Sequence, residues 1–218
     1  MHKVMVFIDY ENFNIALNYF SHDRLGLQTS LRLDYLEFPQ RLVEILPGSG
    51  NRLVKTFLFA PKPDDFLIQE RRRKNTYEWL NFMKNKPYFT VAEGRHIARP
   101  TAGKPMDIKD KYSYYVEEKG TDVLMATNIL SKAFQNAFDT AVIVSNDSDY
   151  IPILDVMNTI GKTSVCVGLA SQYMERLRPH TDDVILLDEE FFKKCTRPDS
   201  VTIPPVEFGA QTLEVARE

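Results

Sequence analysis

Two aspartates stand where an apolar run gives way to polar sequence. Asp147 and Asp149 follow the run at 141–144, with Ser145 and Asn146 between. A continuous β-branched run is typical of a buried parallel strand, and ligands of open α/β sheets bind just beyond the carboxyl ends of their strands. Carboxylates one residue apart at such a place either repel each other or share a cation. The pattern therefore indicates a cation site.

The same arrangement occurs twice more along the chain. Asp9 follows the apolar run at 4–8 and is itself followed by Glu11 and Asn12, and Asp122 opens a helix-like segment behind residues 119–121. Hard divalent ions bind oxygen ligands and usually keep several waters. We therefore predict a Mg²⁺ or Mn²⁺ site whose protein ligands come from strand ends. Its expected ligands are Asp9, Asp122, Asp147 and Asp149.

Each of these acids has a plainer interpretation as a helix cap. Asp and Asn side chains accept hydrogen bonds from the free N–H groups of a first helical turn, so Asp9, Asn12, Asp122 or Asp149 could serve only to begin a helix. One acid suffices for a cap, whereas three strand-to-helix junctions here carry acids, which favours ligands. Glu11 alternates with Asp9, and we expect it to point away from the cluster.

The apolar pattern predicts alternating strands and helices, typical of a mainly parallel sheet covered on both faces. Expected strands lie at 4–8, 53–59, 141–145, 163–168 and 183–187. Expected helices lie at 12–20, 34–46, 65–84, 121–137, 149–160, 172–178 and 189–194. Two strand-forming stretches flank the segment Arg99–Lys104, which predicts an inserted β-hairpin over about 87–119. Residues 21–33 read as a polar connection.

The bulk composition favours one domain with a large core. The chain has 218 residues, 44% of them hydrophobic, so we assign residues 1–195 to one α/β domain and 196–218 to an extended tail. No stretch reaches the ~18 apolar residues of a membrane span, and no secretory signal is evident. Of two cysteines, Cys166 lies in an apolar run. These features are those of a cytoplasmic protein without a membrane partner.

Charge is distributed unevenly. Residues 52–111 carry 14 Lys or Arg against 7 Asp or Glu, although the net charge of the chain is −3. This region would attract a polyanion, although the run at 71–74 could also be a solvated helix face. The candidate contacts are Arg71, Arg72, Arg73, Lys74, Arg95, Arg99, Lys104, Lys109 and Lys111. Tyr88, Tyr112 and Tyr114 could stack unpaired bases, but packing within the hairpin is the favoured interpretation for them.

Three ordered motifs resemble those of the NYN domain family, which belongs to the PIN-like nuclease superfamily. They are residues 7–12 (Phe-Ile-Asp-Tyr-Glu-Asn), 119–123 (Lys-Gly-Thr-Asp-Val) and 144–152 (Val-Ser-Asn-Asp-Ser-Asp-Tyr-Ile-Pro). The resemblance covers roughly residues 3–190 and implies a three-layer α/β/α fold with a metal-dependent ribonuclease site. The positions carried over are Asp9, Asn12, Asp122, Asp147 and Asp149. Asn146 departs from the glycine that the family often has there.

We therefore expect a divalent-metal-dependent endoribonuclease acting on single-stranded or looped RNA. Metal-bound aspartates can activate a water and polarise a phosphate, while the four histidines are scattered and offer no paired acid and base. One alternative is a non-catalytic RNA-binding module that keeps the fold. Another is a haloacid dehalogenase-type phosphatase, which needs a second Asp where this chain has Glu11. A homodimer is left open.

Overall fold

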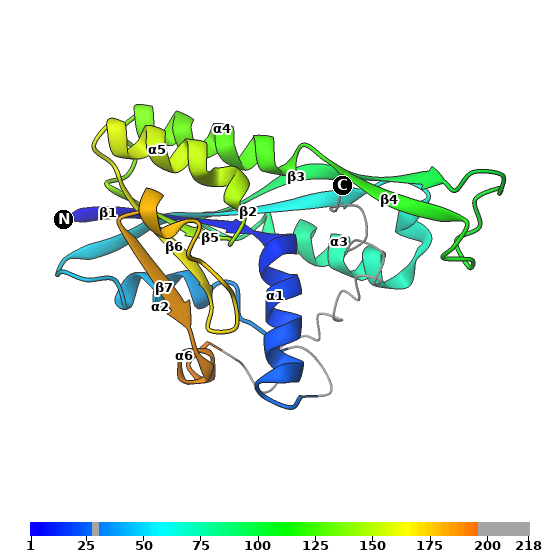
Figure 1. Ribbon diagram of the computed structural model, residues 1–218, viewed down its shortest axis with the longest axis horizontal. Coiled ribbons are helices and arrows are strands. Elements are labelled where there is room, and N and C mark those ends of the chain that lie inside the picture. Colours follow the sequence, from blue (N-terminus) through cyan, green and yellow to red (C-terminus); the bar gives the residue numbers. More distant parts are fainter. Residues whose placement is uncertain (28–30, 196–218) are drawn as a thin grey trace.

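The computed structural model describes residues 1–27 and 31–195, and within them it contains a seven-stranded sheet (Figure 1). The strand order is β4-β3-β2-β1-β5-β6-β7, and every neighbouring pair is parallel except β3 with β4. The strands are β1 (His2–Asp9), β2 (Asn51–Pro63), β3 (Phe89–Pro100), β4 (Tyr114–Lys119), β5 (Thr140–Val144), β6 (Thr163–Leu169) and β7 (Asp183–Leu187).

Helices cover both faces of the sheet. Helices α4 (Thr121–Phe134) and α5 (Ile151–Thr159) pack on one face. The opposite face carries α1 (Tyr10–Asp23), α2 (Phe38–Glu44), α3 (Arg71–Met83) and α6 (Glu189–Lys193). The short 3₁₀ turns are η1 (Leu67–Gln69), η2 (Ser148–Tyr150) and η3 (Arg178–His180). This is the three-layer α/β/α architecture expected for a PIN-like fold, and it confirms the predicted fold class.

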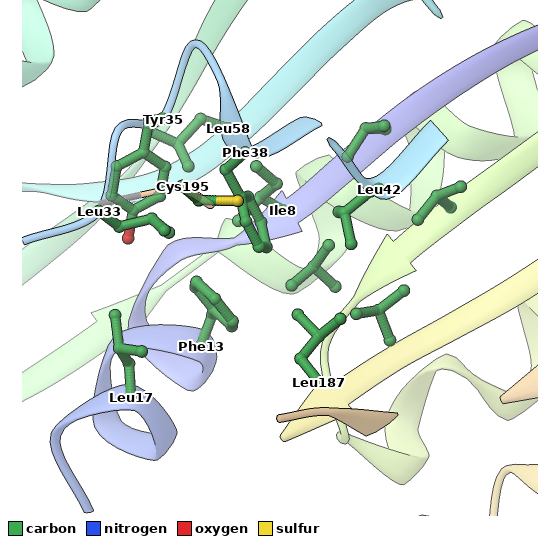
Figure 2. Close-up of a cluster of buried hydrophobic side chains, with 14 of the residues drawn as sticks. Ile8, Phe13, Leu17, Leu33, Tyr35, Phe38, Leu42, Leu58, Leu187 and Cys195 are labelled. Carbon is green, nitrogen blue, oxygen red and sulfur yellow. The ribbon is translucent and has the colours of Figure 1, made fainter. Parts of the chain in front are cut away.

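The central strand β1 is buried on both faces. Because successive side chains of a strand point to opposite faces, Val6 and Ile8 join the core under α1 and α2, while Phe7 packs in the core under α4 and α5. Figure 2 shows the first of these cores, where Ile8 lies near Phe13 of α1 and Phe38 of α2. A continuous apolar run is therefore required in β1, and polarity returns only where the strand ends.

The sheet brings the three motif regions to one edge. Ile8 of β1 is the register partner of Val144 of β5, so the residues that follow both strands emerge side by side. β3 is parallel to β2 over Phe89–His96 and antiparallel to β4 over Arg95–Pro100. The predicted hairpin is present, and its first arm is also a full strand of the sheet. β4 runs back from the hairpin tip and delivers α4 to the same edge.

Some predicted helices differ from the structure. No α-helix forms at 172–178, because the segment only links the adjacent strands β6 and β7. There the Gln172 side chain accepts a hydrogen bond from the Leu169 amide (2.8 Å), and Met174 and Leu177 are buried in the core. The predicted helix at 65–84 is broken at Glu70, which is extended (ψ 121°) and separates η1 from α3. The helix predicted at 34–46 shortens to α2.

Other expectations concern the thiols, the tail and membrane spans. Cys166 and Cys195 are free and buried within the described part of the chain. The predicted tail, 196–218, lies outside the described residues. No helix among residues 1–27 and 31–195 is both long and apolar enough to cross a bilayer.

Candidate active site at the carboxyl edge of the sheet

Asp9 lies at the centre of the edge and is 5% exposed. Its Oδ1 accepts a hydrogen bond from the Asn12 amide (3.2 Å), so it does cap α1. Its Oδ2 faces the other way, where the Ser145 and Tyr150 hydroxyls both donate at 3.3 Å. Burial raises the pKa of Asp9 to about 7, and the negative charges of nearby carboxylates add to this effect. Asp9 therefore caps α1 with one carboxylate oxygen and presents the other to Ser145 and Tyr150.

Tyr150 joins Asp9 to the second predicted acid. Its hydroxyl lies 3.3 Å from Asp9 Oδ2 and 3.2 Å from Asp122 Oδ1, so it can donate its proton to either carboxylate. Burial, followed by the charges of these two aspartates, raises the pKa of Tyr150 far above its ordinary value. The hydroxyl therefore stays protonated, and it holds together two carboxylates that would otherwise repel each other.

Two glycines place Asp122 at the edge. Gly120, which precedes α4, has a φ of +85°, a left-handed conformation that L-residues with side chains adopt at a cost. Gly94 of β3 lies against the start of α4, where a Cβ would come within 2.0 Å of Thr121 Oγ1 and 2.9 Å of Thr121 N. The absence of a side chain at Gly94 thus permits the close approach that brings Asp122 beside Asp9.

Asp147 and Asp149 occupy the loop after β5. The Asp147 amide donates to Ser145 Oγ (3.2 Å), and Asp147 Oδ1 accepts from the Asp149 amide (2.9 Å), so Asp147 rather than Asp149 caps the following turn. Asn12 Oδ1 accepts from the Asn146 amide at 3.2 Å. Asn12 therefore ties α1 to this loop, and the loop carries both aspartates to the cluster.

Neighbouring acids act on the charge of Asp122. Burial raises the pKa of Asp122, and the charges of Glu118, Asp147 and Asp149 raise it further. Among the described residues, no lysine or arginine forms an ion pair with any of the four aspartates. Oxygen donors concentrated in this way without a counter-charge suit a hard divalent cation.

Three further residues belong to this edge, and sequence reasoning did not select them. Glu11, expected to point away from the cluster, faces it: its Oε1 lies 3.0 Å from His96 Nε2, and it shares a hydrogen bond with Glu118. Ligand atoms of Glu11, His96 and Glu118 all lie within 4.8 Å of one another. Burial raises the pKa of both glutamates to about 7. The only sequence signal for Glu118 was its position four residues before Asp122.

His96 is held between a carboxylate and a guanidinium. Arg73 Nη1 donates to His96 Nδ1 (3.2 Å), and Arg73 Nε donates to Glu70 Oε2 (2.8 Å), which leaves the His96 Nε2–H to donate to Glu11. Burial and then the positive charge of Arg73 lower the pKa of His96 to about 4. His96 is thus a neutral positioning group, and Arg73 is engaged inside the protein rather than exposed on the surface of α3.

The other predicted cations lie on α3, on β3 and in the hairpin loop. Arg71, Lys74, Arg95, Arg99, Lys104, Lys109 and Lys111 are exposed, and Arg72 is half-buried. Arg99 pairs with Glu117 at 3.0 Å. Of the three tyrosines, Tyr114 packs edge-on against Phe66, which lies outside the hairpin, whereas Tyr88 and Tyr112 are exposed.

Comparison with known proteins agrees with the motifs. The sequence model of the NYN domain matches residues 3–188. The chain belongs to the NYN domain family. This is a nuclease family of the PIN-like superfamily, its members typically depend on a divalent metal, and a nuclease domain acts on nucleic acid.

Two other comparisons add less. No curated protein matches the chain. The crystal structure of a protein of unknown function from Vibrio parahaemolyticus aligns over 87% of this chain and 95% of that one. Its TM-score is 0.53 and its sequence identity 16%, so this likeness concerns the fold alone.

Proposed function

We propose that this NYN domain is a divalent-metal-dependent endoribonuclease that cleaves single-stranded or looped RNA. The observation that carries the proposal is the buried Asp9 carboxyl, whose pKa is raised to about 7 in a cluster of acids without an ion-paired lysine or arginine among the described residues. Holding several carboxylates together in this way destabilises the free protein. Such an arrangement is expected where a cation completes the site.

The donor set fits Mg²⁺ or Mn²⁺. Asp9, Asp122, Asp147 and Asp149 would hold the ion, and all offer the oxygen ligands that these ions prefer. A bound ion would supply a water of lowered pKa and would stabilise the charge that develops on the phosphate. Glu11 and Glu118 lie close enough to add negative charge to the site.

The protein's own residues keep the cluster in one arrangement. Ser145 and Tyr150 donate to the same oxygen of Asp9, which fixes the rotation of that carboxylate. Asn12 holds the loop that bears Asp147 through its contact with the Asn146 amide. Such fixed orientation lowers the entropic cost of bringing reacting groups together. Asn12 therefore acts here through the loop that it positions.

RNA would reach the acids along the basic side of the domain. The exposed cations of α3, β3 and the hairpin loop lie in the region 52–111, whose balance of charge is positive. Phosphate contacts by lysine and arginine supply most of the sequence-independent affinity for nucleic acids. The remainder of the chain is acidic and would repel the same backbone, which favours approach from the α3 and hairpin side.

A cleavage assay with matched variants tests this function. Wild type, Asp147→Asn and the exposed control Asp65→Asn are incubated with unstructured and hairpin RNAs in Mg²⁺, Mn²⁺ or EDTA. We expect internal cleavage by wild type and Asp65→Asn in either metal, and none in EDTA or with Asp147→Asn. An Asn at position 147 keeps an oxygen for the Asp149 amide, so the loop is retained.

The rival functions give different results in the same assay. Cleavage that continues in EDTA would contradict a metal mechanism. RNA binding without cleavage in any metal would favour a non-catalytic module. Hydrolysis of a simple phosphomonoester, abolished by Asp9→Asn, would instead favour the phosphatase.

A further inference from the structure

A cavity opens directly beside the acid cluster. It lies between α3, the end of β2 and the start of α1. Glu11 and His96, which contact each other at the edge of the acid cluster, also line this cavity. One wall is therefore shared between the cavity and the candidate active site. The cavity and the acid cluster therefore adjoin at these two residues.

The remaining walls offer flat apolar surface. Tyr10, Tyr77 and Leu80 line the cavity from the helices, and Pro61 and Pro63 line it from β2. Lys62 Nζ and Lys84 Nζ lie over the Tyr77 ring, 5.3 Å and 5.8 Å from its centroid, so this ring makes cation–π contacts. Planar, sequence-tolerant π surface beside cations is the combination that binds single-stranded nucleic acids by base stacking.

The polar end of the cavity provides both donors and acceptors. Arg72 and Arg73 are both among its lining residues, and Arg73 pairs with Glu70 and also contacts His96. Glu11 and Glu70 add acceptor oxygens. A phosphate would meet two carboxylates as well as the two arginines, so the wall offers it no net positive charge. An uncharged planar group with N–H and carbonyl edges suits this wall much better.

We propose that this cavity binds one nucleobase of the RNA, that of a nucleotide flanking the cleaved phosphate. The inference rests on the proposed function, because that function places the phosphate next to this base at the acids. The base stacks between the apolar walls, and its edge faces the polar end. Its capture draws the adjacent phosphate toward Asp9 and Asp122, so the cavity contributes to positioning of the substrate and to any base preference of cleavage.

The test combines a filled cavity with RNAs that lack single bases. Thr76 lines the cavity from α3, so Thr76→Phe fills it, whereas Glu78→Phe places the same ring at an exposed position of the same helix outside the cavity. Tyr77→Ala removes a wall of the cavity instead, and it tests the proposal even if Thr76→Phe does not fold. Each protein is assayed with RNAs that carry one abasic nucleotide at successive positions around the cleavage site.

For wild type and Glu78→Phe, we expect one position at which base removal lowers cleavage about tenfold, the size of a lost stacking contact. In Thr76→Phe and Tyr77→Ala, intact RNA should be cleaved about tenfold more slowly and the abasic effect at that position should disappear. If every position tolerates base removal equally in wild type, or if Thr76→Phe keeps the wild-type pattern, the cavity proposal is wrong.

A binding measurement separates this proposal from the cleavage function. Fluorescence anisotropy of the same labelled RNAs in EDTA requires no catalysis. Wild type could bind the RNA without ever cleaving it, while one abasic position weakens binding to wild type and Glu78→Phe but not to Thr76→Phe. That result would support the base site and contradict the nuclease function. If cleavage is normal, and neither base removal nor Thr76→Phe changes the binding affinity, the base-site proposal is wrong while the nuclease function is supported.

Discussion

The raised pKa of Asp9 makes a quantitative prediction about stability. Its ordinary pKa of 3.8 rises to about 7 in the folded protein, so the folded state holds the proton more tightly than the unfolded state. The resulting stability is fully present below pH 3.8 and is lost as the pH rises through about 7. Between about pH 5 and about pH 8, Asp9 alone therefore lowers the free energy of unfolding by about 3 kcal/mol.

Asp9→Asn removes this titration and keeps most of the contacts. The amide oxygen can accept from the Asn12 amide, and the amide nitrogen can donate to the hydroxyls of Ser145 and Tyr150. The free energy of unfolding of the variant, minus that of wild type, should thus be about 3 kcal/mol larger at about pH 8 than at about pH 5. Taking the difference between the two pH values cancels changes in packing that do not depend on pH.

Urea unfolding in EDTA, followed by the fluorescence of Trp79, measures both free energies. Asp139→Asn is the control, because Asp139 accepts from the Lys3 amide (2.7 Å) and its pKa is lowered, so its loss should destabilise the protein equally at both pH values. Added Mg²⁺ should stabilise wild type at about pH 8 and leave Asp9→Asn nearly unchanged. An effect of Asp9→Asn that is the same at both pH values, or a destabilisation that grows with pH, would refute the reasoning.

Other consequences follow from the packing and the charge distribution. Gly94→Ala should clash with Thr121, lower the free energy of unfolding by about 1–3 kcal/mol and impair cleavage, as denaturant titration and kcat would show; unchanged stability would mean that β3 and α4 are free to separate. Replacing Arg71 and Lys74 with Ala should weaken RNA binding and flatten its salt dependence by about 0.7 per lost phosphate contact, and an unaltered slope would assign both to a solvated helix face. Shortening the hairpin tip at Arg99–Lys104 should impair cleavage of long RNAs more than of short ones, whereas equal loss on both would indicate a connecting or protein-binding role.

Local pattern was sufficient to predict the core of the sheet and the edge at which the four aspartates lie. The runs that became β1 and β5 are continuously apolar because both faces of those strands are buried, and such runs are visible without any knowledge of the fold. Parallel strands end at one edge, so Asp9 and Asp147 could be expected together once their strands were assigned. The prediction of a helix at 172–178 was wrong. The apolar residues of this segment are buried within a short link between two strands and do not form one face of a helix.

Glu11, His96 and Glu118 could be recognised only in the tertiary structure. His96 and Glu118 are register partners across β3 and β4, which places them on the same face of an antiparallel pair, and Glu11 meets them from the first turn of α1. That register depends on how far β3 extends beyond β2, and no residue near either position specifies it. The sequence by itself thus determined which strands end in acids, because burial leaves a local apolar signature. Only the tertiary structure decided which distant charges share the edge with them, because that depends on strand register and on the close packing that Gly94 permits.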